Sequence, residues 1–391
     1  MTTAESAQGN RRGLPRLPIS KDMAIAGGVI LFGLVLPLFF ESGSPFMDDA
    51  ITILCYVVFA LGLNIVVGFA GLLDLGYVAF YALGSLTMGW LASGFVDKIH
   101  DGKGIHIGVS EFLKGQPGIH LNFLLVLVGT IIVAAIAGIV IGLPTLRLRG
   151  DYIAIVTLAF GEIIRVIALN GDELKIAGQQ VTNGAQGITP VDKVDLPIVA
   201  PFTSLELRPW YYTALGLVVL VLFVNFRVRD SRLGRAWIAV REDEVAAASM
   251  GVPLVKTKLL AYAAGGAFGG MAGALLASYQ NTVNSDQFQF GFSIFVLAMV
   301  ILGGLGSIWG VVVGAVVLAY INFSLIPDVL NTVPGKVGLD FDLTEVNFMI
   351  FGFLLVIMMV LRPQGLIPER RRQAELTGDE SGGETLYEVK A

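Results

Sequence analysis

Glu162 and Arg165 are the first candidates for chemistry, because they are charged residues within a strongly apolar segment, 151–170. Residues three apart lie on one face of a helix, so the two side chains have the spacing of an ion pair. Charged groups at membrane depth are costly and point by default to a cavity, a partner or a function. We favour an intrahelical pair that neutralises itself and fixes packing, while a lock to another helix and direct contact with a solute remain open.

A second group of polar residues accompanies a glycine-rich interruption. Asp74 and Tyr77 lie near Gly71, where two apolar segments meet, and Asn64 lies in the first of these segments. A hydrophobic segment broken by glycine can expose backbone groups to a transported solute. For Asp74 we favour a structural role as a cap or hinge over contact with the substrate. For Asn64, a structural role and contact with the substrate both remain open. Together with Glu162 and Arg165, these four residues are the candidates for lining a path.

The sequence contains no motif for nucleotide or hydrolytic chemistry. Neither Gly-Lys pair, at 102–103 and 335–336, is followed by Ser or Thr, so the phosphate-binding G-x-x-x-x-G-K-[ST] loop is missing. The patterns H-E-x-x-H, G-x-S-x-G and C-x-x-C are missing as well. His100, His106 and His120 share one loop, with a spacing that fits no metal site. We therefore predict no enzyme activity, no metal and no cofactor in this chain, so that uphill movement of a solute would depend on a partner or an ion gradient.

Composition indicates a polytopic membrane protein. Hydrophobic residues make up 55% of the 391 residues and charged residues 15%, and the mean hydropathy is +0.75. A helix needs about 20 apolar residues to cross about 30 Å of hydrocarbon. Ten segments meet or approach this length: 23–40, 51–69, 77–96, 121–143, 151–170, 210–226, 258–281, 292–304, 309–326 and 345–361. GGLGSIWG separates the eighth from the ninth and predicts either a tight turn or a break within one irregular pair.

Lys and Arg beside short loops predict the orientation, since cytoplasmic loops are enriched in both. The basic clusters precede the first segment and follow the fourth, sixth and tenth: Arg11, Arg12, Arg16 and Lys21; Arg147 and Arg149; Arg227, Arg229, Arg232, Arg235 and Arg241; Arg362 and Arg370–Arg372. Ten crossings put all these clusters on one side. We therefore predict an all-α membrane protein of about ten transmembrane helices, some short or interrupted by Gly, with both termini in the cytoplasm.

This topology divides the chain into a cytoplasmic leader, a membrane domain and a cytoplasmic tail. The boundaries are 1–22, 23–362 and 363–391, and the acidic tail is predicted to be disordered. Within the membrane domain we expect outer loops at 97–120, 171–209 and 331–345, and a cytoplasmic loop at 227–257. The outer loops are surfaces for an external partner. The first apolar segment lacks a signal-peptidase site, so we predict a retained helix.

The stretch GRAWIAVREDEVAAASMGV, 234–252, is rich in charge and alanine although apolar segments flank it. We predict a segment capped by Ser231 and then a short helix over Arg241–Met250. Acids favour the first turn of a helix and glycine favours its end. The residues that define this helix are Arg241, Glu242, Asp243, Glu244, Ala246, Ala247, Ala248 and Gly251. Its small alanine side chains would let a partner approach closely, and the alternative is a solvated helix that only connects two spans.

Glycine also recurs every fourth residue in the seventh apolar segment, at Gly265, Gly269 and Gly273. Such a stripe allows two transmembrane helices to approach closely. We favour packing within the chain over a seam with a partner subunit.

The charged stretch resembles the cytoplasmic coupling loop of bacterial ABC importer permeases, where E-A-A is followed after three residues by G. Ala246 and Ala247 stand at the alanine positions before Gly251, whereas Val245 replaces the usual Glu and Glu244 lies one position earlier. Four further blocks are similar to LivM-type permeases of branched-chain amino-acid importers: GLNIVVGFAGLLDLGYVAFYALG (62–84), LPTLRLRGDYIAIVTLAFGEIIRV (143–166), LGGLGSIWGVVVGA (302–315) and LRPQGLIP (361–368). With the loop, these blocks cover most of residues 50–370.

This resemblance implies a division of labour within an importer. A LivH-type permease would complete the path, two ATPase subunits would hold ATP and Mg²⁺, and a soluble binding protein would deliver the solute. Arg241–Glu244, Ala246, Ala247 and Gly251 would lie in a cleft of an ATPase. The chain would reside in the lipid bilayer of the bacterial cytoplasmic (inner) membrane and would bind no nucleic acid.

Two alternatives remain open at this point. Related permeases import urea, short amides or other amino acids, and the binding protein usually selects the solute. A proton-coupled secondary transporter would instead use Glu162 and Arg165 as a relay and would need no coupling helix.

Overall fold

The computed structural model describes residues 21–97, 104–111, 113–146, 148, 152–176, 178–195, 202–330, 347–362 and 364–367. Several predictions concern residues outside these ranges: most of the leader, the loop 331–345, most of the tail, His100, Arg147, Arg149 and Arg370–Arg372.

Each of the ten apolar segments coincides with a helix. In chain order the helices are α1 (Lys21–Val35), α2 (Pro45–Leu63), α3 (Val78–Leu91), α4 (Phe123–Thr145), α5 (Tyr152–Leu169), α6 (Arg208–Arg229), α9 (Leu254–Gln280), α10 (Phe290–Gly303), α11 (Ile308–Tyr320) and α13 (Asn347–Leu361). The π-helical turns η2 (Asn64–Phe69) and η6 (Ile321–Leu330) continue α2 and α11. The described residues also form three 3-10 turns: η1 (Leu36–Leu38), η4 (Gly184–Gln186) and η5 (Ser285–Phe288).

Within the described part of the chain, 6 helices are long and apolar enough to cross a membrane. They are Pro45–Phe69, Phe123–Thr145, Tyr152–Leu169, Arg208–Arg229, Leu254–Gln280 and Ile308–Pro327. Shorter apolar helices are Gly27–Leu38, Val78–Leu91 and Phe290–Gly303. The fold is therefore that of a mostly helical, multi-pass membrane protein, while ten crossings with both ends in the cytoplasm stay a prediction.

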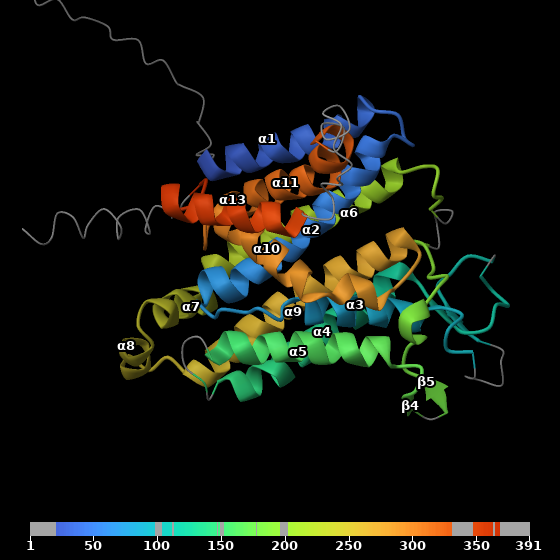
Figure 1. Ribbon diagram of the computed structural model, residues 1–391, viewed down its shortest axis with the longest axis horizontal. Helices are drawn as coiled ribbons and strands as arrows, with labels where there is room; N and C mark the ends of the chain where they lie inside the picture. The colour runs from blue at the N-terminus through green and yellow to red at the C-terminus, as the bar shows by residue number, and fades with distance from the viewer. Residues whose placement is uncertain are drawn as a thin grey trace, which may run out of the picture.

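Helix α9 lies at the centre of the bundle and packs against α2, α3 and α4. Its backbone meets theirs with no room for side chains: a Cβ on Gly84 of α3 would lie 2.1 Å from Gly270 O, and one on Gly138 of α4 would lie 2.4 Å from Tyr262 O. Around this centre, α1, α11 and α13 lie on one side, and α4 and α5 lie on the other (Figure 1). Lipid provides no hydrophobic driving force for helix association, so the close van der Waals packing that glycine allows holds these helices together.

The sequence GGLGSIWG forms a tight turn between two complete helices. Helix α10 ends at Gly303, and Gly304 and Gly306 have φ of 118° and 85°. Ser307 then caps α11, because its Oγ accepts a hydrogen bond from the N–H of Gly310 at 3.1 Å. A Cβ on Gly310 would lie 2.4 Å from Gly303 O, so α11 packs closely back against α10.

Short strands lie in the predicted outer loops 97–120 and 171–209, and one lies within the predicted span 77–96, where α3 ends at Leu91. A three-stranded sheet has the order β1 (Ala92–Ser93), β3 (Ile119–Leu121) and β2 (Ile105–Ile107), with β1 antiparallel and β2 parallel to β3. Strands β4 (Lys175–Ile176) and β5 (Gln179–Gln180) form a small hairpin. Strands of two or three residues are too short to produce an alternating pattern, so the all-helical prediction omitted them.

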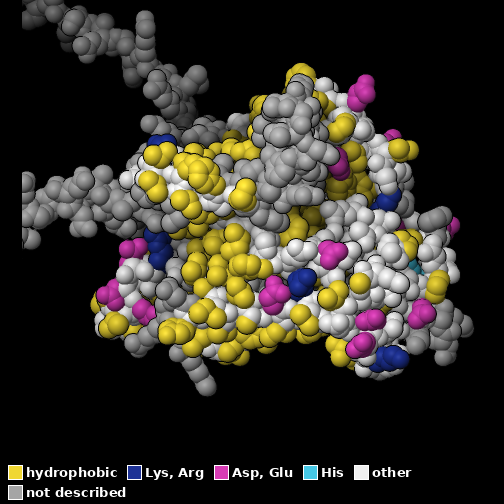
Figure 2. Space-filling view, viewed as in Figure 1, with side chains coloured by type: hydrophobic (Ala, Val, Ile, Leu, Met, Phe, Trp, Pro, Cys, Tyr) yellow, Lys and Arg dark blue, Asp and Glu magenta, His cyan; other side chains and the backbone are white. Residues whose placement is uncertain are grey.

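Apolar side chains cover much of the flank of the bundle, and many charged side chains gather at its two ends (Figure 2). The exposed apolar residues of α4 and α5 include Leu124, Val128, Ile132, Ile136, Val140, Leu143, Ile155, Ile163 and Val166. A soluble protein rarely exposes so continuous an apolar surface, whereas lipid or a second membrane subunit would cover it.

Candidate functional site

Two short helices, α7 (Arg232–Glu242) and α8 (Glu244–Ser249), project from one end of the bundle (Figure 1). Ser231 caps α7 as predicted, since its Oγ accepts a hydrogen bond from Gly234 N–H at 3.2 Å. Trp237 is 1% exposed and donates from Nε1 to Thr257 O at 2.7 Å. This buried indole fixes α7 to the first turn of α9.

The prediction of one helix over Arg241–Met250 is wrong, because Asp243 interrupts the helix and separates α7 from α8. Asp243 is extended, with φ −153° and ψ 111°, and its Oδ1 accepts hydrogen bonds from Val245 N–H at 2.8 Å and Ala246 N–H at 2.9 Å. An aspartate with this geometry starts a new helix. Glu242 is therefore the last residue of α7, and only Glu244 occupies the first turn of α8.

The predicted alanine face of α8 is exposed at Ala246 and Ala248 but not at Ala247. Ala247 is only 5% exposed, whereas Val245 is 79% and Met250 is 84% exposed. The one-turn length of α8 places Ala247 on the face that rests on this chain, so it cannot accept a bulky partner. Gly251 is exposed, has φ 85°, and donates to Ala248 O at 3.0 Å, so it ends α8 as predicted. The surface that α8 presents includes Ala246 and Ala248, and its large apolar side chains are Val245 and Met250.

Arg241 faces the spans instead of the surface beyond α8. Its Nη1 donates to Gly68 O at 2.6 Å, at the end of η2. Gly71 has φ 69°, and a Cβ there would lie 2.6 Å from Arg241 Cγ. The π-helical turn leaves carbonyls without regular helical partners, and the guanidinium satisfies one of them. Arg241 therefore joins α7 to the interruption after α2.

A second tie joins α8 to the first turns of α9. Lys258 Nζ lies 2.7 Å from Glu244 Oε1, and the Lys258 side chain is 7% exposed. Next to it lies a cavity of about 390 Å³ between α7, α8 and the loop 70–73. Gly71, Arg241, Glu244 and Lys258 all line this cavity. Sequence reasoning missed Lys258, although a lysine at the start of an apolar helix is a signal for a partner.

The polar residues near the interruption hold it in place from within. Asn64 Oδ1 accepts from Gly306 N–H at 3.0 Å, Asp74 Oδ1 accepts from Gly76 N–H at 2.9 Å, and Tyr77 OH donates to Gly265 O at 2.7 Å. Asn64, Asp74 and Tyr77 are each at most 1% exposed. Asp74 thus closes a local turn before α3 and does not cap this helix, whose N-cap residue is Tyr77, and a path-lining role for these residues stays a prediction.

Helix α5 presses directly on this interruption. Leu75 N–H donates to Thr157 Oγ1 at 3.1 Å. A Cβ on Gly76 would lie 1.7 Å from Thr157 O, and Gly161 also packs against Gly76. The loop between α2 and α3 and the first half of α5 therefore form one packed unit.

Glu162 and Arg165 form an intrahelical ion pair farther along α5. Arg165 Nη1 lies 3.4 Å from Glu162 Oε2, and the side chains are 30% (Arg165) and 38% (Glu162) exposed. The neighbouring Ile163 and Val166 are exposed and apolar. A charged pair on such a face is costly against lipid, so a protein partner or water must cover it in the membrane.

Glu162→Gln alone should lower the amount of assembled transporter, because it leaves Arg165 without its partner. An unpaired Arg at membrane depth costs about 2.5–3.5 kcal/mol on insertion scales. The double substitution Glu162→Gln with Arg165→Met should recover part of the loss. Gel filtration of the detergent-extracted complex measures this, and equal damage from the single and the double substitution would mean that at least one of the groups has a direct role of its own.

The glycine stripe of α9 faces the interior of this chain. A Cβ on Gly265 would lie 2.4 Å from Val66 Cγ2, and one on Gly273 would lie 2.2 Å from Tyr81 O. Gly269 packs similarly against Tyr77. The stripe thus packs against η2 and α3, so any seam with a partner needs another surface.

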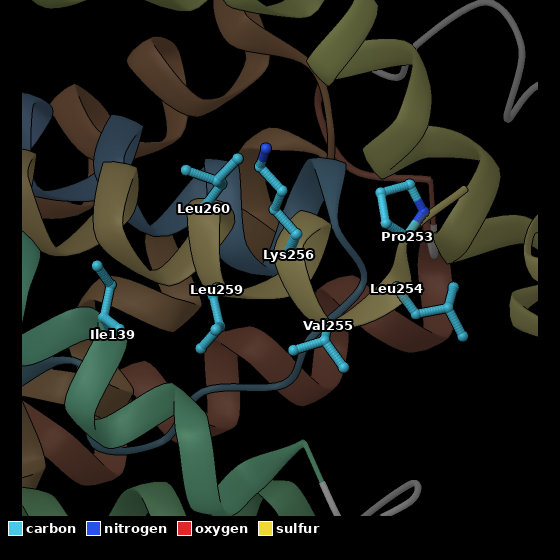
Figure 3. A pocket seen from close by; sticks show the side chains of 7 residues that line it. All are labelled: Ile139, Pro253, Leu254, Val255, Lys256, Leu259 and Leu260. Carbon is cyan, nitrogen blue, oxygen red and sulfur yellow. The ribbon is translucent and has the colours of Figure 1, made fainter. Parts of the chain in front are cut away.

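An apolar groove on the outside of α4 and α9 is a surface where a partner subunit could pack (Figure 3). Its volume is about 580 Å³, and it is lined by Ile139 and by the first turns of α9. In Figure 3, Leu260 and Lys256 point away from one side of α9, and Leu259 and Val255 point away from the other. It continues the exposed apolar face of α4, so lipid or a partner helix would fill it.

At the opposite end of the bundle, His120 joins the two strand-containing loops. Its Nδ1 lies 2.6 Å from Asp192 Oδ2 and its Nε2 lies 3.2 Å from Pro117 O. Burial alone would lower the pKa of His120, but the hydrogen bond and charge of Asp192 outweigh it and raise the pKa above 6.5. The ring of His106 stacks on that of His120, with centroids 5.3 Å apart. No group of three or more potential metal ligands occurs among the residues that the structure describes.

The raised pKa of His120 predicts a stability that falls as the pH rises. The stabilising contribution is complete below about pH 6.5, the unfolded value, and is lost as the pH rises through the higher folded pKa. We expect the melting temperature of the wild type to fall between about pH 6.5 and pH 9 more steeply than that of His120→Gln. If the melting temperatures of the two proteins fell equally steeply with pH, the raised pKa of His120 would be contradicted.

The helical bundle, the projecting α7–α8 pair and the glycine-packed centre are those of a membrane permease. The family described as branched-chain amino acid transport system / permease component matches residues 48–361, and the chain belongs to this family. The chain is 36% identical over 376 residues to the high-affinity branched-chain amino acid transport system permease protein LivM of Salmonella typhimurium, which covers 91% of this chain and 77% of that protein. The resemblance seen in the sequence is thereby confirmed.

Two further relatives extend the comparison. LivM of Escherichia coli is 37% identical over 366 residues, which is 87% of this chain and 75% of that protein. The permease protein LivH of Escherichia coli is 27% identical over 169 residues, which is 43% of this chain and 49% of that protein. No solved structure matches the chain.

Proposed function

We propose that this chain is the transmembrane permease subunit of an ATP-driven importer of branched-chain amino acids. The similarity to LivM proteins over most of the chain supports the substrate class. The observation that carries the mechanism is α8, a short capped helix with the exposed apolar residues Val245 and Met250 at the end of the bundle. A buried aromatic or aliphatic anchor is what a partner needs for stable docking.

The proposed assembly contains a LivH-type permease, two ATPase subunits that hold ATP and Mg²⁺, and a soluble binding protein. Partial similarity to LivH is in keeping with two related permeases that share one path. We infer that the α8 end faces the cytoplasm of a bacterium, that the chain crosses the inner membrane about ten times, and that the strand-containing end faces outward. The basic residues next to α7 support this orientation.

Motion of the ATPases would reach the spans through two contacts. Arg241 connects α7 to Gly68 O, and Glu244 connects α8 to Lys258. Gly68 lies at the end of η2, immediately before the interruption that α5 packs against. A displacement of α8 would therefore act on the irregular backbone between α2 and α3. Such backbone can switch between two packed conformations more readily than a regular helix can.

Glu162 and Arg165 would then face the space shared with the second permease. Their half-exposed side chains on an otherwise apolar face support this inference. A proton-coupled transporter would use the same pair as a relay, but it would leave the capped, exposed α8 without a role. Urea or another amino acid as the solute remains the alternative within the family.

Copurification from the native membrane tests the proposal. We expect the tagged chain to retain a second permease and two ATPase subunits, and the associated binding protein to hold leucine, isoleucine or valine. Isolation of the chain without any ATPase would contradict an ATP-driven importer, and a binding protein loaded with urea would redirect the substrate assignment.

A further inference from the structure

A cavity of about 610 Å³ lies at the end of the bundle opposite α8. It opens between the first turns of α2, the start of α6 and the last turn of α9. The lining includes Ser44, Asp48, Lys193, Leu207, Trp210 and Tyr279. Its volume is in the range of small-molecule sites, about 300–1,000 Å³.

The cavity carries one positive and one negative group that do not neutralise each other. Asp48 accepts a hydrogen bond from Tyr279 OH, and Lys193 Nζ donates to Ser204 Oγ. No ion pair joins Asp48 to Lys193 in the part of the chain that the structure describes. Separated charges of opposite sign in one cavity are complementary to a zwitterion.

The remaining lining favours a particular orientation of such a ligand. Ser44 Oγ is buried and has no hydrogen-bond partner among the described residues. Ser44 is also the residue before α2, whose N-terminus carries a partial positive charge that favours a carboxylate. Leu207 and Trp210 also line the cavity, but they are 8% and 1% exposed, and the Trp210 ring is fixed by an edge contact with Tyr279 at 5.2 Å between centroids.

We propose that this cavity is a receiving site for a free α-amino acid. Lys193 and the N-terminus of α2 would bind the carboxylate, and Asp48 would bind the ammonium group. The solute class and the outward orientation of this end rest on the proposed function. The site is where a solute released by the binding protein would first meet this chain.

A single-cysteine reporter tests the site directly. Cys55 is the only cysteine in the sequence and is 2% exposed, so a new thiol would be the accessible one. In the full transporter in vesicles, we expect leucine to slow the alkylation of Ser204→Cys by a membrane-impermeant maleimide at least fivefold. Leu205→Cys is the matched control, because Leu205 is 83% exposed and does not line the cavity. Gln280→Cys on another wall serves as a second reporter if Ser204→Cys is poorly produced.

The two charges are tested in the same reporter protein. Lys193→Met or Asp48→Asn should raise the leucine concentration for half-protection at least tenfold, and 4-methylpentanoate and isoamylamine, which each lack one charge, should protect weakly. Protection that is absent, or unchanged in both charge variants, would overturn the site. ATP-dependent leucine uptake by the wild type is measured alongside: uptake without protection refutes this site alone, and protection without ATP-dependent uptake refutes the importer alone.

Discussion

Replacing Val245 and Met250 together by Asp should abolish uptake while leaving the permease in the membrane at near-normal amounts. The two side chains are 79% and 84% exposed, so the substitution removes no packing within this chain. In the complex, each substitution would remove an apolar side chain whose burial is worth about 2 kcal/mol, which is about 30-fold in affinity per residue. The ATPases should therefore fail to copurify with the variant.

Leu205→Asp is the control, since Leu205 is 83% exposed at the other end of the bundle. It should retain the ATPases in full. Ala247→Trp is unsuitable for this purpose, because Ala247 is buried against its own chain and the indole would disturb α8 itself. Normal amounts of bound ATPase in the Val245/Met250 variant would show that α8 is only a connection between spans.

Gly76→Ala should prevent the chain from folding into a stable transporter. The new Cβ would lie 1.7 Å from Thr157 O and 2.4 Å from Thr157 C, both backbone atoms of α5 that cannot rotate away. The cost should exceed about 3 kcal/mol, the upper end of ordinary overpacking. Fluorescence-detected gel filtration of a tagged variant should show aggregated or degraded protein in place of a single peak.

Gly216→Ala provides the comparison. Gly216 lies within α6, and a Cβ there would meet nothing within 4 Å. Alanine is favoured over glycine in a helix by about 1 kcal/mol, so this variant should be at least as stable as the wild type. A stable Gly76→Ala protein with normal uptake would mean that α5 and the interruption are not packed as described.

The helices could be predicted because their signal is local and strong. Runs of apolar residues define α1 to α6, α9 to α11 and α13, and the motif from Ala246 to Gly251 predicts a helix end at Gly251 with its φ of 85°. Positions three apart on one helix also predict a pair such as Glu162 and Arg165, which lie 3.4 Å apart. Each of these features depends only on neighbours along the chain.

Features that depend on distant residues could not be predicted in the same way. Two successive segments are predicted over Ser231–Met250, but the boundary between them lies at Asp243 and not before Arg241, because the acid could cap a helix as readily as stand in its first turn. Ala247 is buried because α8 folds back on its own chain. Arg241 reaches Gly68, 173 positions away, and His120 reaches Asp192, 72 positions away. No spacing in the sequence indicates such pairs.

Uptake into reconstituted vesicles tests the central claim most directly. The vesicles would contain this chain, its partner permease, the two ATPases and the binding protein, with labelled leucine outside and no pH gradient. We predict uptake that requires both ATP and the binding protein and that is lost when Val245 and Met250 are replaced by Asp. Uptake that is driven by an imposed pH gradient without ATP, or that is undiminished in this variant, would contradict an importer coupled through α8.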